Sequence, residues 1–165
     1  KHLYLVCAIA LIPGAAFAQS QVERLESLSE DMSRVMAVMM ANEVEAQGGD
    51  GAALRSAASA MPPWDDRMRA AGACMLDGYE SASSRAEVDS MLSNMESAIN
   101  QMPSMTMTEF TESDMSDGMM PQGMTLEQTA AINEQCGVME LQMEAMQQSG
   151  FMEAMMTAGS TVPDS

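Results

Sequence analysis

Seven methionines crowd into residues 102–124, and their thioether sulfurs are the side chains in this sequence best suited to hold a metal. Six of them follow the spacings M-x-x-M-x-M and M-M-x-x-x-M. A thioether is a soft donor, which suits Cu(I) or Ag(I) far better than hard cations. The predicted ligands are Met102, Met105, Met107, Met119, Met120 and Met124.

Methionine clusters in an acidic exported protein resemble the methionine motifs of bacterial periplasmic copper-handling proteins. The resemblance covers residues 102–124 and implies binding or sequestration of Cu(I) or Ag(I). Many such proteins also use histidine, whereas the only histidine here is His2. Cu(II) favours imidazole, so the sequence argues against Cu(II).

A second group of soft side chains is Met61, Trp64 and Met68, because an indole face beside thioethers can shield a soft cation. Simpler interpretations stay open for both groups. Trp64 could anchor the core at a helix start, and the methionines of 102–124 could cap the core from a loop. Exposed methionines could also serve as a sink for oxidants, since they readily form sulfoxides.

The first 18 residues are typical of a signal peptide. Lys1-His2 precedes an apolar run over residues 3–12, then the breaker Pro13-Gly14 and the small-residue site Ala16-Phe17-Ala18. A run of ten is too short for a membrane span, which needs about 20 residues. We therefore expect a signal peptide over residues 1–18, cleavage after Ala18, no membrane span after its removal, and a periplasmic or secreted protein. The alternative is an N-terminal core helix.

After that cleavage the chain contains no lysine and no histidine, and it keeps all 24 acidic residues with six arginines, a net charge of −18. It therefore lacks the residues of a Ser-His-Asp triad, a Cys-His pair, a His-bound zinc or a lysine Schiff base. The acidity also excludes a general affinity for nucleic acid and disfavours anionic lipid. We expect no enzymatic activity.

Apolar residues recur at steps of three and four in four segments, which predicts four main helices. The stripes are Leu25, Leu28, Met32, Val35 and Met39; Trp64, Met68, Ala71, Met75 and Tyr79; Val88, Met91, Met95, Ile99 and Met102; and Ile132, Cys136, Met139, Met143 and Met146. Shorter helices are expected over residues 52–61 and 151–156. Many stripe positions are methionine, so we expect thioethers to fill much of the core.

Helix ends are also marked in the sequence. Ser20 is the expected N-cap of the first helix, and Gly48-Gly49 ends it. Two capping-box sequences, Ser84–Glu87 and Thr125–Gln128, predict the starts of the third and fourth main helices. Pro103 predicts the end of the third of these helices, and Gly150 predicts the end of the fourth.

The predicted fold is all-α: a small irregular bundle of about four main helices with a methionine-rich loop and one interhelical disulfide. The helical domain covers residues 19–158, with the loop at 102–124, and residues 159–165 form a flexible C-terminal tail. Cys74 and Cys136 both fall on predicted apolar helix faces, and export to an oxidising compartment favours a bond between them. Their separation of 62 residues makes that bond worth about 4 kcal/mol in the chain-entropy model.

These features favour a small exported, non-enzymatic acidic helical protein that acts through protein–protein contact. Methionine-rich helix faces form adaptable interfaces, for a partner protein or for self-association. Neither the partner nor any cofactor is specified by the sequence. The alternative function is soft-metal binding, with Cu(I) as the ligand of the 102–124 cluster.

Overall fold

The computed structural model describes residues 14–113 and 118–160, and over these residues it shows an all-α fold without strands. A short 3-10 helix, η1 (Met102–Ser104), follows the fourth of the eight α-helices found there. The α-helices are α1 (Gly14–Ala46), α2 (Ala52–Ser59), α3 (Asp66–Ala82), α4 (Arg85–Gln101), α5 (Met107–Glu112), α6 (Leu126–Gln135), α7 (Val138–Gln148) and α8 (Phe151–Ser160).

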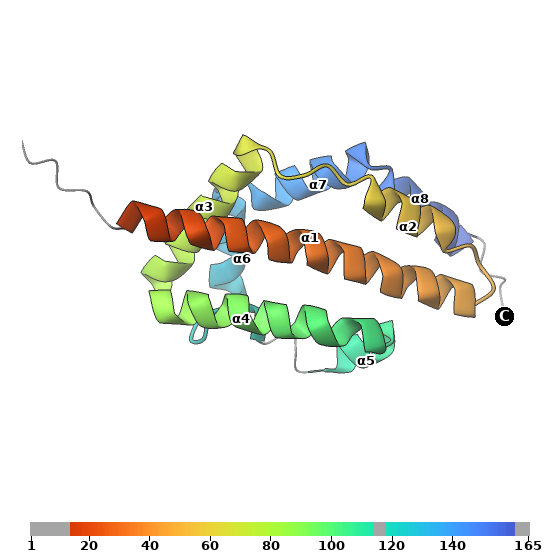
Figure 1. Ribbon diagram of the computed structural model, residues 1–165, viewed down its shortest axis with the longest axis horizontal. Coiled ribbons are helices and arrows are strands. Elements are labelled where there is room, and N and C mark those ends of the chain that lie inside the picture. The colour runs from red at the N-terminus through yellow and green to blue at the C-terminus, as the bar shows by residue number, and fades with distance from the viewer. Residues whose placement is uncertain (1–13, 114–117, 161–165) are drawn as a thin grey trace, which may run out of the picture.

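Helix α1 is the axis of the molecule. Its 33 residues span about 50 Å at 1.5 Å per residue. Figure 1 shows α4 running along one side of α1, with α2 and α8 beside its C-terminal half and α3 crossing near its N-terminal end. One long helix thus carries two groups of shorter helices.

The buried side chains form two clusters along α1. The first joins α1, α3 and α4: Leu25, Leu28, Leu76, Tyr79, Val88, Met91, Leu92 and Met124. The second joins α1, α2 and α8: Ala37, Ala41, Leu54, Ala57, Phe151, Ala154 and Ala158. The alanines of the second cluster let three helices approach closely around one aromatic ring.

Methionine fills only part of this core. Among the described residues, five methionines are buried: Met39, Met68, Met91, Met102 and Met124. Leucine, valine and alanine hold most of the other buried positions, so the expectation that thioethers replace leucine is correct at these five sites and too broad elsewhere.

Several predicted helix ends are confirmed. The Ser84 hydroxyl accepts a hydrogen bond from the Glu87 N–H at the start of α4, and α6 begins with the complete box of Thr125 and Gln128. Helix α4 gives way to η1 one residue before Pro103. These polar caps satisfy N–H groups that a helix leaves without partners at its first turn.

The first helix begins earlier than expected, at Gly14 rather than after Ser20. Residues 14–20 contain three alanines and no proline, so nothing in them interrupts a helix. The expected cleavage point after Ala18 therefore lies within α1, and cleavage there stays a prediction. Residues 1–13 of the predicted signal peptide and 161–165 of the predicted tail lie outside the described residues.

The fourth predicted helix is broken in two. Gly137 adopts a left-handed backbone with φ 70°, which ends α6 and starts α7 in a new direction. The break rotates the side chains that follow it about the helix axis, so the buried residue of α7 is Val138 and not the methionines of the predicted stripe. Met139 and Met143 are consequently 58% and 43% exposed, and their predicted place in the core is wrong.

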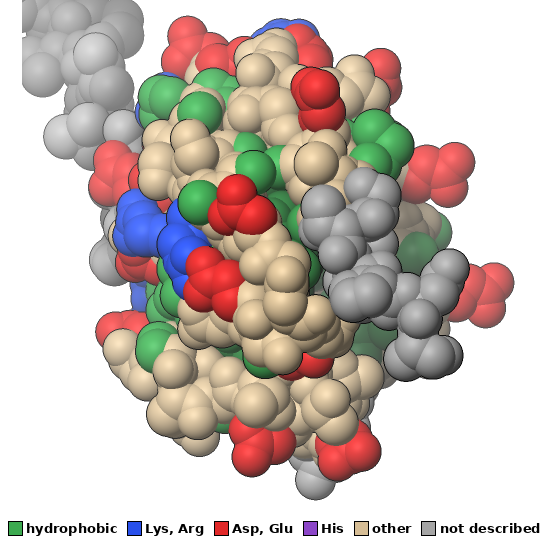
Figure 2. Space-filling model, turned by 90° about the vertical axis from the view of Figure 1, so that its right-hand side faces the viewer, with side chains coloured by type: hydrophobic (Ala, Val, Ile, Leu, Met, Phe, Trp, Pro, Cys, Tyr) green, Lys and Arg blue, Asp and Glu red, His purple; other side chains and the backbone are tan. Residues whose placement is uncertain are grey.

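Charge is spread unevenly over the surface. Figure 2 shows the end of the molecule that carries α2, α8 and the C-terminal part of α1. Acidic side chains are scattered across this end, whereas the few arginine side chains in view lie mostly at one edge, with another at the top. The view agrees with a chain of 24 acidic and seven basic residues.

Candidate functional site

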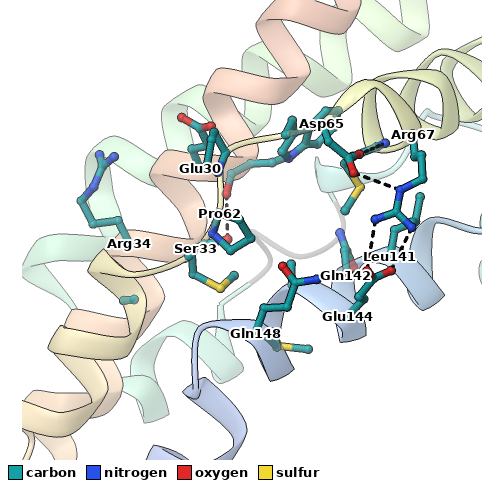
Figure 3. Close-up of a pocket in the computed structure, with 18 of the residues that line it drawn as sticks. Glu30, Ser33, Arg34, Pro62, Asp65, Arg67, Leu141, Gln142, Glu144 and Gln148 are labelled. Carbon is teal, nitrogen blue, oxygen red and sulfur yellow. Dashed lines mark hydrogen bonds and ion pairs between the residues drawn. The ribbon is translucent and has the colours of Figure 1, made fainter.

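A groove of about 720 Å³ lies between α1, α7 and the segment that joins α2 to α3 (Figure 3). Its apolar walls come from three parts of the chain. They are lined by Ala58, Met61, Pro62, Pro63, Trp64, Met68, Leu141, Ala145 and Met146. A volume of this size is typical of sites for small molecules or for a few side chains of a partner.

The wall around Trp64 is fixed by close packing. A Cβ atom built on Gly72 of α3 would lie 2.8 Å from the Trp64 ring, so only glycine lets the indole approach this helix so closely. Asp65 follows immediately and caps α3, accepting a hydrogen bond from the Met68 N–H at 2.9 Å. The predicted role of Trp64 as an anchor at a helix start agrees with this geometry.

An ion-pair bridge closes one end of the groove. Arg67 of α3 donates to both carboxylate oxygens of Glu144 on α7, at 3.1 and 3.2 Å, and to Asp65 at 3.0 Å (Figure 3). The Met68 N–H and the Arg67 guanidinium hold the pKa of Asp65 below its ordinary value. Two carboxylates raise the pKa of Arg67 further above neutrality, so the bridge stays charged at any physiological pH.

The second predicted soft-metal group lies in this groove. Met61, Trp64 and Met68 all line it, and the structure adds Met146 from α7, which the sequence did not connect with them. The Met61 sulfur accepts a hydrogen bond from the Ser149 hydroxyl at 3.2 Å. Met68 is only 7% exposed, so core packing explains its position without a metal.

The six predicted metal ligands are split by the fold. Met102 is completely buried in η1, between α1 and α4. Met105, Met107 and Met119 are half-buried. The expected loop contains η1 and α5, where Thr106 and Glu109 form a complete capping box. The sequence carried this signal as T-x-x-E at Thr106 and Glu109, but it was not among the predicted helix starts.

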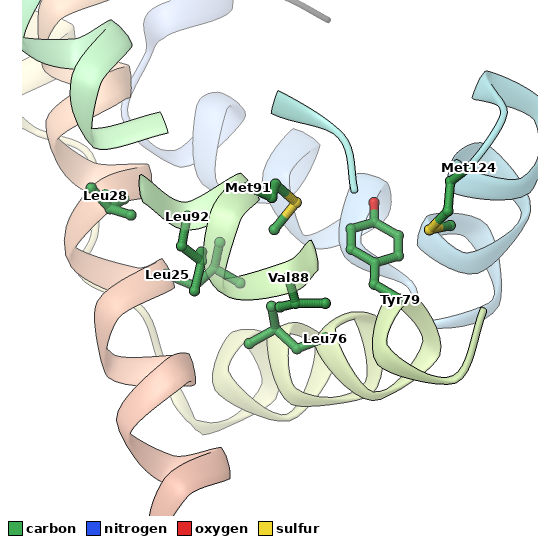
Figure 4. Close-up of a cluster of buried hydrophobic side chains, with 8 residues drawn as sticks. All are labelled: Leu25, Leu28, Leu76, Tyr79, Val88, Met91, Leu92 and Met124. Atoms are coloured by element: carbon green, nitrogen blue, oxygen red, sulfur yellow. The ribbon is translucent and has the colours of Figure 1, made fainter. Parts of the chain in front are cut away.

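Two of the predicted ligands do meet in a smaller cavity of about 330 Å³. Met120 and Met124 line it together with Met91 of α4, which was not among the predicted ligands. Figure 4 shows the Met91 and Met124 thioethers on either side of the Tyr79 ring. Sulfur–aromatic contacts of this kind also stabilise ordinary cores. The Tyr79 hydroxyl donates to Asn133 at 2.8 Å.

Cys74 and Cys136 lie at bonding distance, with sulfurs 2.00 Å and Cα atoms 5.7 Å apart, so the predicted disulfide is present. It links α3 to the C-cap of α6, directly before the break at Gly137. Cys74 is exposed rather than part of an apolar face. The buried side of α3 holds Met68 and Tyr79, and residue 74 projects well away from that side.

Helix α7 presents a second surface on the side away from the groove. The exposed residues Met139, Glu140, Met143 and Gln147 form what we call the α7 Met face. Met139 and Met143 lie one helical turn apart, and Glu140 is three residues from Met143. These two neighbouring exposed thioethers make the α7 Met face a candidate contact surface.

Two further findings concern metals and membranes. Within residues 14–113 and 118–160, no group of three or more His, Cys, Asp or Glu side chains could hold a metal ion. No helix in the same part of the chain combines the length and the apolar character needed to cross a membrane.

The chain matches no protein-family model, and no curated protein or solved structure shows significant similarity to it.

Proposed function

We propose that this chain is a small exported, non-enzymatic helical protein that works by contact with another protein through the α7 Met face. What supports the non-enzymatic part is composition: beyond residues 1–2 the sequence has neither lysine nor histidine. What supports the contact is the exposure of Met139 and Met143.

The exposure of these two side chains is the observation that carries the proposal. Met139 is 58% exposed and Met143 43%, so a partner that covers them gains about 1 kcal/mol from each. Methionine has three flexible bonds and a polarizable sulfur, so it adapts to the shape of a partner surface. The groove lies on the other side of the same helix and offers further contact area.

Site-specific photocrosslinking in the cells that make the protein tests this proposal. Met143→benzoylphenylalanine should give one discrete adduct with a partner protein. Val38 provides a matched control, because it is 40% exposed on α1. The proposal fails if position 143 gives no adduct, or if positions 143 and 38 give the same adducts.

A second proposal is Cu(I) or Ag(I) binding, favoured by the meeting of Met91, Met120 and Met124 at one small cavity. Three thioethers can provide the donor set that a soft monovalent cation prefers. Met120→Leu combined with Met124→Leu removes two of the three donors while keeping apolar bulk.

Anaerobic titration with Cu(I) against a competing chelator measures the effect. The double variant should bind Cu(I) more weakly by about tenfold or more. Met105→Leu combined with Met107→Leu is the matched control from the same segment and should bind like the unmodified protein. Equal affinity of both variants and the unmodified protein would remove the metal proposal.

A further inference from the structure

The positive charges of this chain are confined to its first 85 residues. All six arginines lie at or before residue 85: Arg24, Arg34, Arg55, Arg67, Arg69 and Arg85. Residues 86–165 contain 13 acidic residues and no lysine, arginine or histidine. Helices α6, α7 and α8 therefore belong to a segment that carries negative charge alone.

Little of this negative charge is neutralised near the α7 Met face. Arg67 reaches α7 from α3, but it binds Glu144 and Asp65 at the same time. Among the described residues, Glu140 takes part in none of the ion pairs. Glu140 thus leaves a free carboxylate beside the two exposed thioethers.

The α7 Met face combines apolar side chains with this negative charge in a helical pattern. Met139 and Met143 form a narrow apolar stripe, and Glu140 borders it. The rest of α7 is engaged elsewhere: Val138 is buried, and Leu141 and Ala145 line the groove. An apolar stripe flanked by charge on one helix matches the face of a second amphipathic helix.

We infer that the partner segment seated on the α7 Met face is a cationic amphipathic helix; this inference rests on the proposed contact function and names the chemistry of the partner. Its apolar side chains cover Met139 and Met143, and its Lys or Arg side chains pair with Glu140. The negative field of residues 86–165 draws it in from a distance.

The negative charge of residues 86–165 also argues against two other binding partners for the α7 Met face. A second copy of this chain would bring a second cation-free segment against the first, and facing like charges oppose such an interface. An anionic lipid surface would be repelled in the same way. A cationic helix gains both apolar burial and charge pairing at this face.

A designed peptide tests the inference with the full, oxidised chain. The probe is a synthetic helix of about 18 residues, with leucines at steps of three and four and lysines elsewhere. Two further peptides carry glutamine or glutamate in place of the lysines. Fluorescence anisotropy should show that the lysine peptide binds at low salt, at least about tenfold more tightly than the glutamine peptide, and that high salt weakens this binding.

Variants connect the binding to the surface. Met139→Gln combined with Met143→Gln should weaken binding of the lysine peptide by about tenfold or more, with the helical circular dichroism retained. Val38→Gln is the matched control and should leave binding unchanged, since it removes a comparable exposed apolar side chain from α1.

Several results would overturn the inference. Equal affinity for the lysine and glutamine peptides contradicts the cationic partner, and unchanged lysine-peptide binding in the double methionine variant contradicts the location. Binding of none of the peptides contradicts the helical partner as a class. In each case the photocrosslinking at position 143 reports separately on whether this face contacts a protein at all.

Discussion

Opening the Cys74–Cys136 disulfide should cost this protein a large part of its stability. The bond closes a loop with a sequence separation of 62, and the chain-entropy model gives about 4 kcal/mol for a loop of that length. For a chain of 165 residues this corresponds to a fall in Tm of about 12 °C. Typical domains have only about 5–15 kcal/mol in total.

The loss should be concentrated in α6 and α7. Among the described residues of α6 none is buried, and in α7 only Val138 is. Apolar burial therefore contributes little to holding these helices in place, and the disulfide does most of it, with the Arg67–Glu144 pair as a further link between α3 and α7. The pair is exposed to solvent and worth little alone. Reduction should release α6 and α7 while α1 and α4 stay packed.

Urea unfolding followed by circular dichroism, with and without a phosphine reductant, measures the global effect. Hydrogen exchange with peptide mass spectrometry locates it, and protection should fall first in residues 126–148. Cys74→Ser combined with Cys136→Ser is the control, because the reductant should not change it further. The reasoning is refuted if reduction changes the free energy of unfolding by less than about 1 kcal/mol, or if α4 loses protection as early as α7.

Three further changes test individual parts of the fold. Met102→Ala opens a cavity at a fully buried site and should lower the free energy of unfolding, measured in urea, by about 3 kcal/mol. Met143→Ala changes an exposed side chain and should lower it by less than about 0.5 kcal/mol. Similar losses in the two variants would contradict the burial of Met102 and the exposure of Met143. Gly137→Ala should lower the free energy of unfolding by about 1 kcal/mol, because alanine disfavours the left-handed backbone at this position. Nothing lies within 4 Å of the added Cβ, so no steric clash adds to this loss. A stabilised variant would show that α6 and α7 form one helix. Hydrogen bonds from Arg69 lower the pKa of Glu26 below its ordinary 4.5, so Glu26 adds stability above that pH and loses it as the pH falls through its lowered pKa. The stability difference between the unmodified protein and Glu26→Gln should therefore disappear in acid, and a constant difference at all pH values would argue against this pair.

The helical class and most helix ends could be predicted because they depend on local signals. The stripes led by Leu25, Trp64 and Val88 have the helical period, and the N-caps of α3 and α4 are satisfied by residues within four positions of the helix start. The box of Thr106 and Glu109 shows that α5 was also predictable from a local signal.

The burial of α7 could not be predicted in the same way. A glycine inside a helical pattern costs only about 1 kcal/mol, so Gly137 alone does not distinguish a tolerated residue from a break. The left-handed turn there depends on how α7 packs against α3 and α8. The break at Gly137 changes which side of the helix each later residue occupies, so Met139 and Met143 lie on the surface instead of in the predicted core. The candidate contact surface on α7 was therefore not predictable from the helical period.

The central claim is that Met139 and Met143 lie exposed on the α7 Met face, whereas Met91 and Met102 are buried in the core. Mild oxidation with hydrogen peroxide, followed by peptide mass spectrometry, reports the rate of sulfoxide formation at each methionine. Met139 and Met143 should oxidise rapidly, while Met91 and Met102, at 2% and 0% exposure, should be protected while the protein stays folded. Equal oxidation rates at all four positions, or protection of Met139 and Met143 in the isolated protein, would contradict the account.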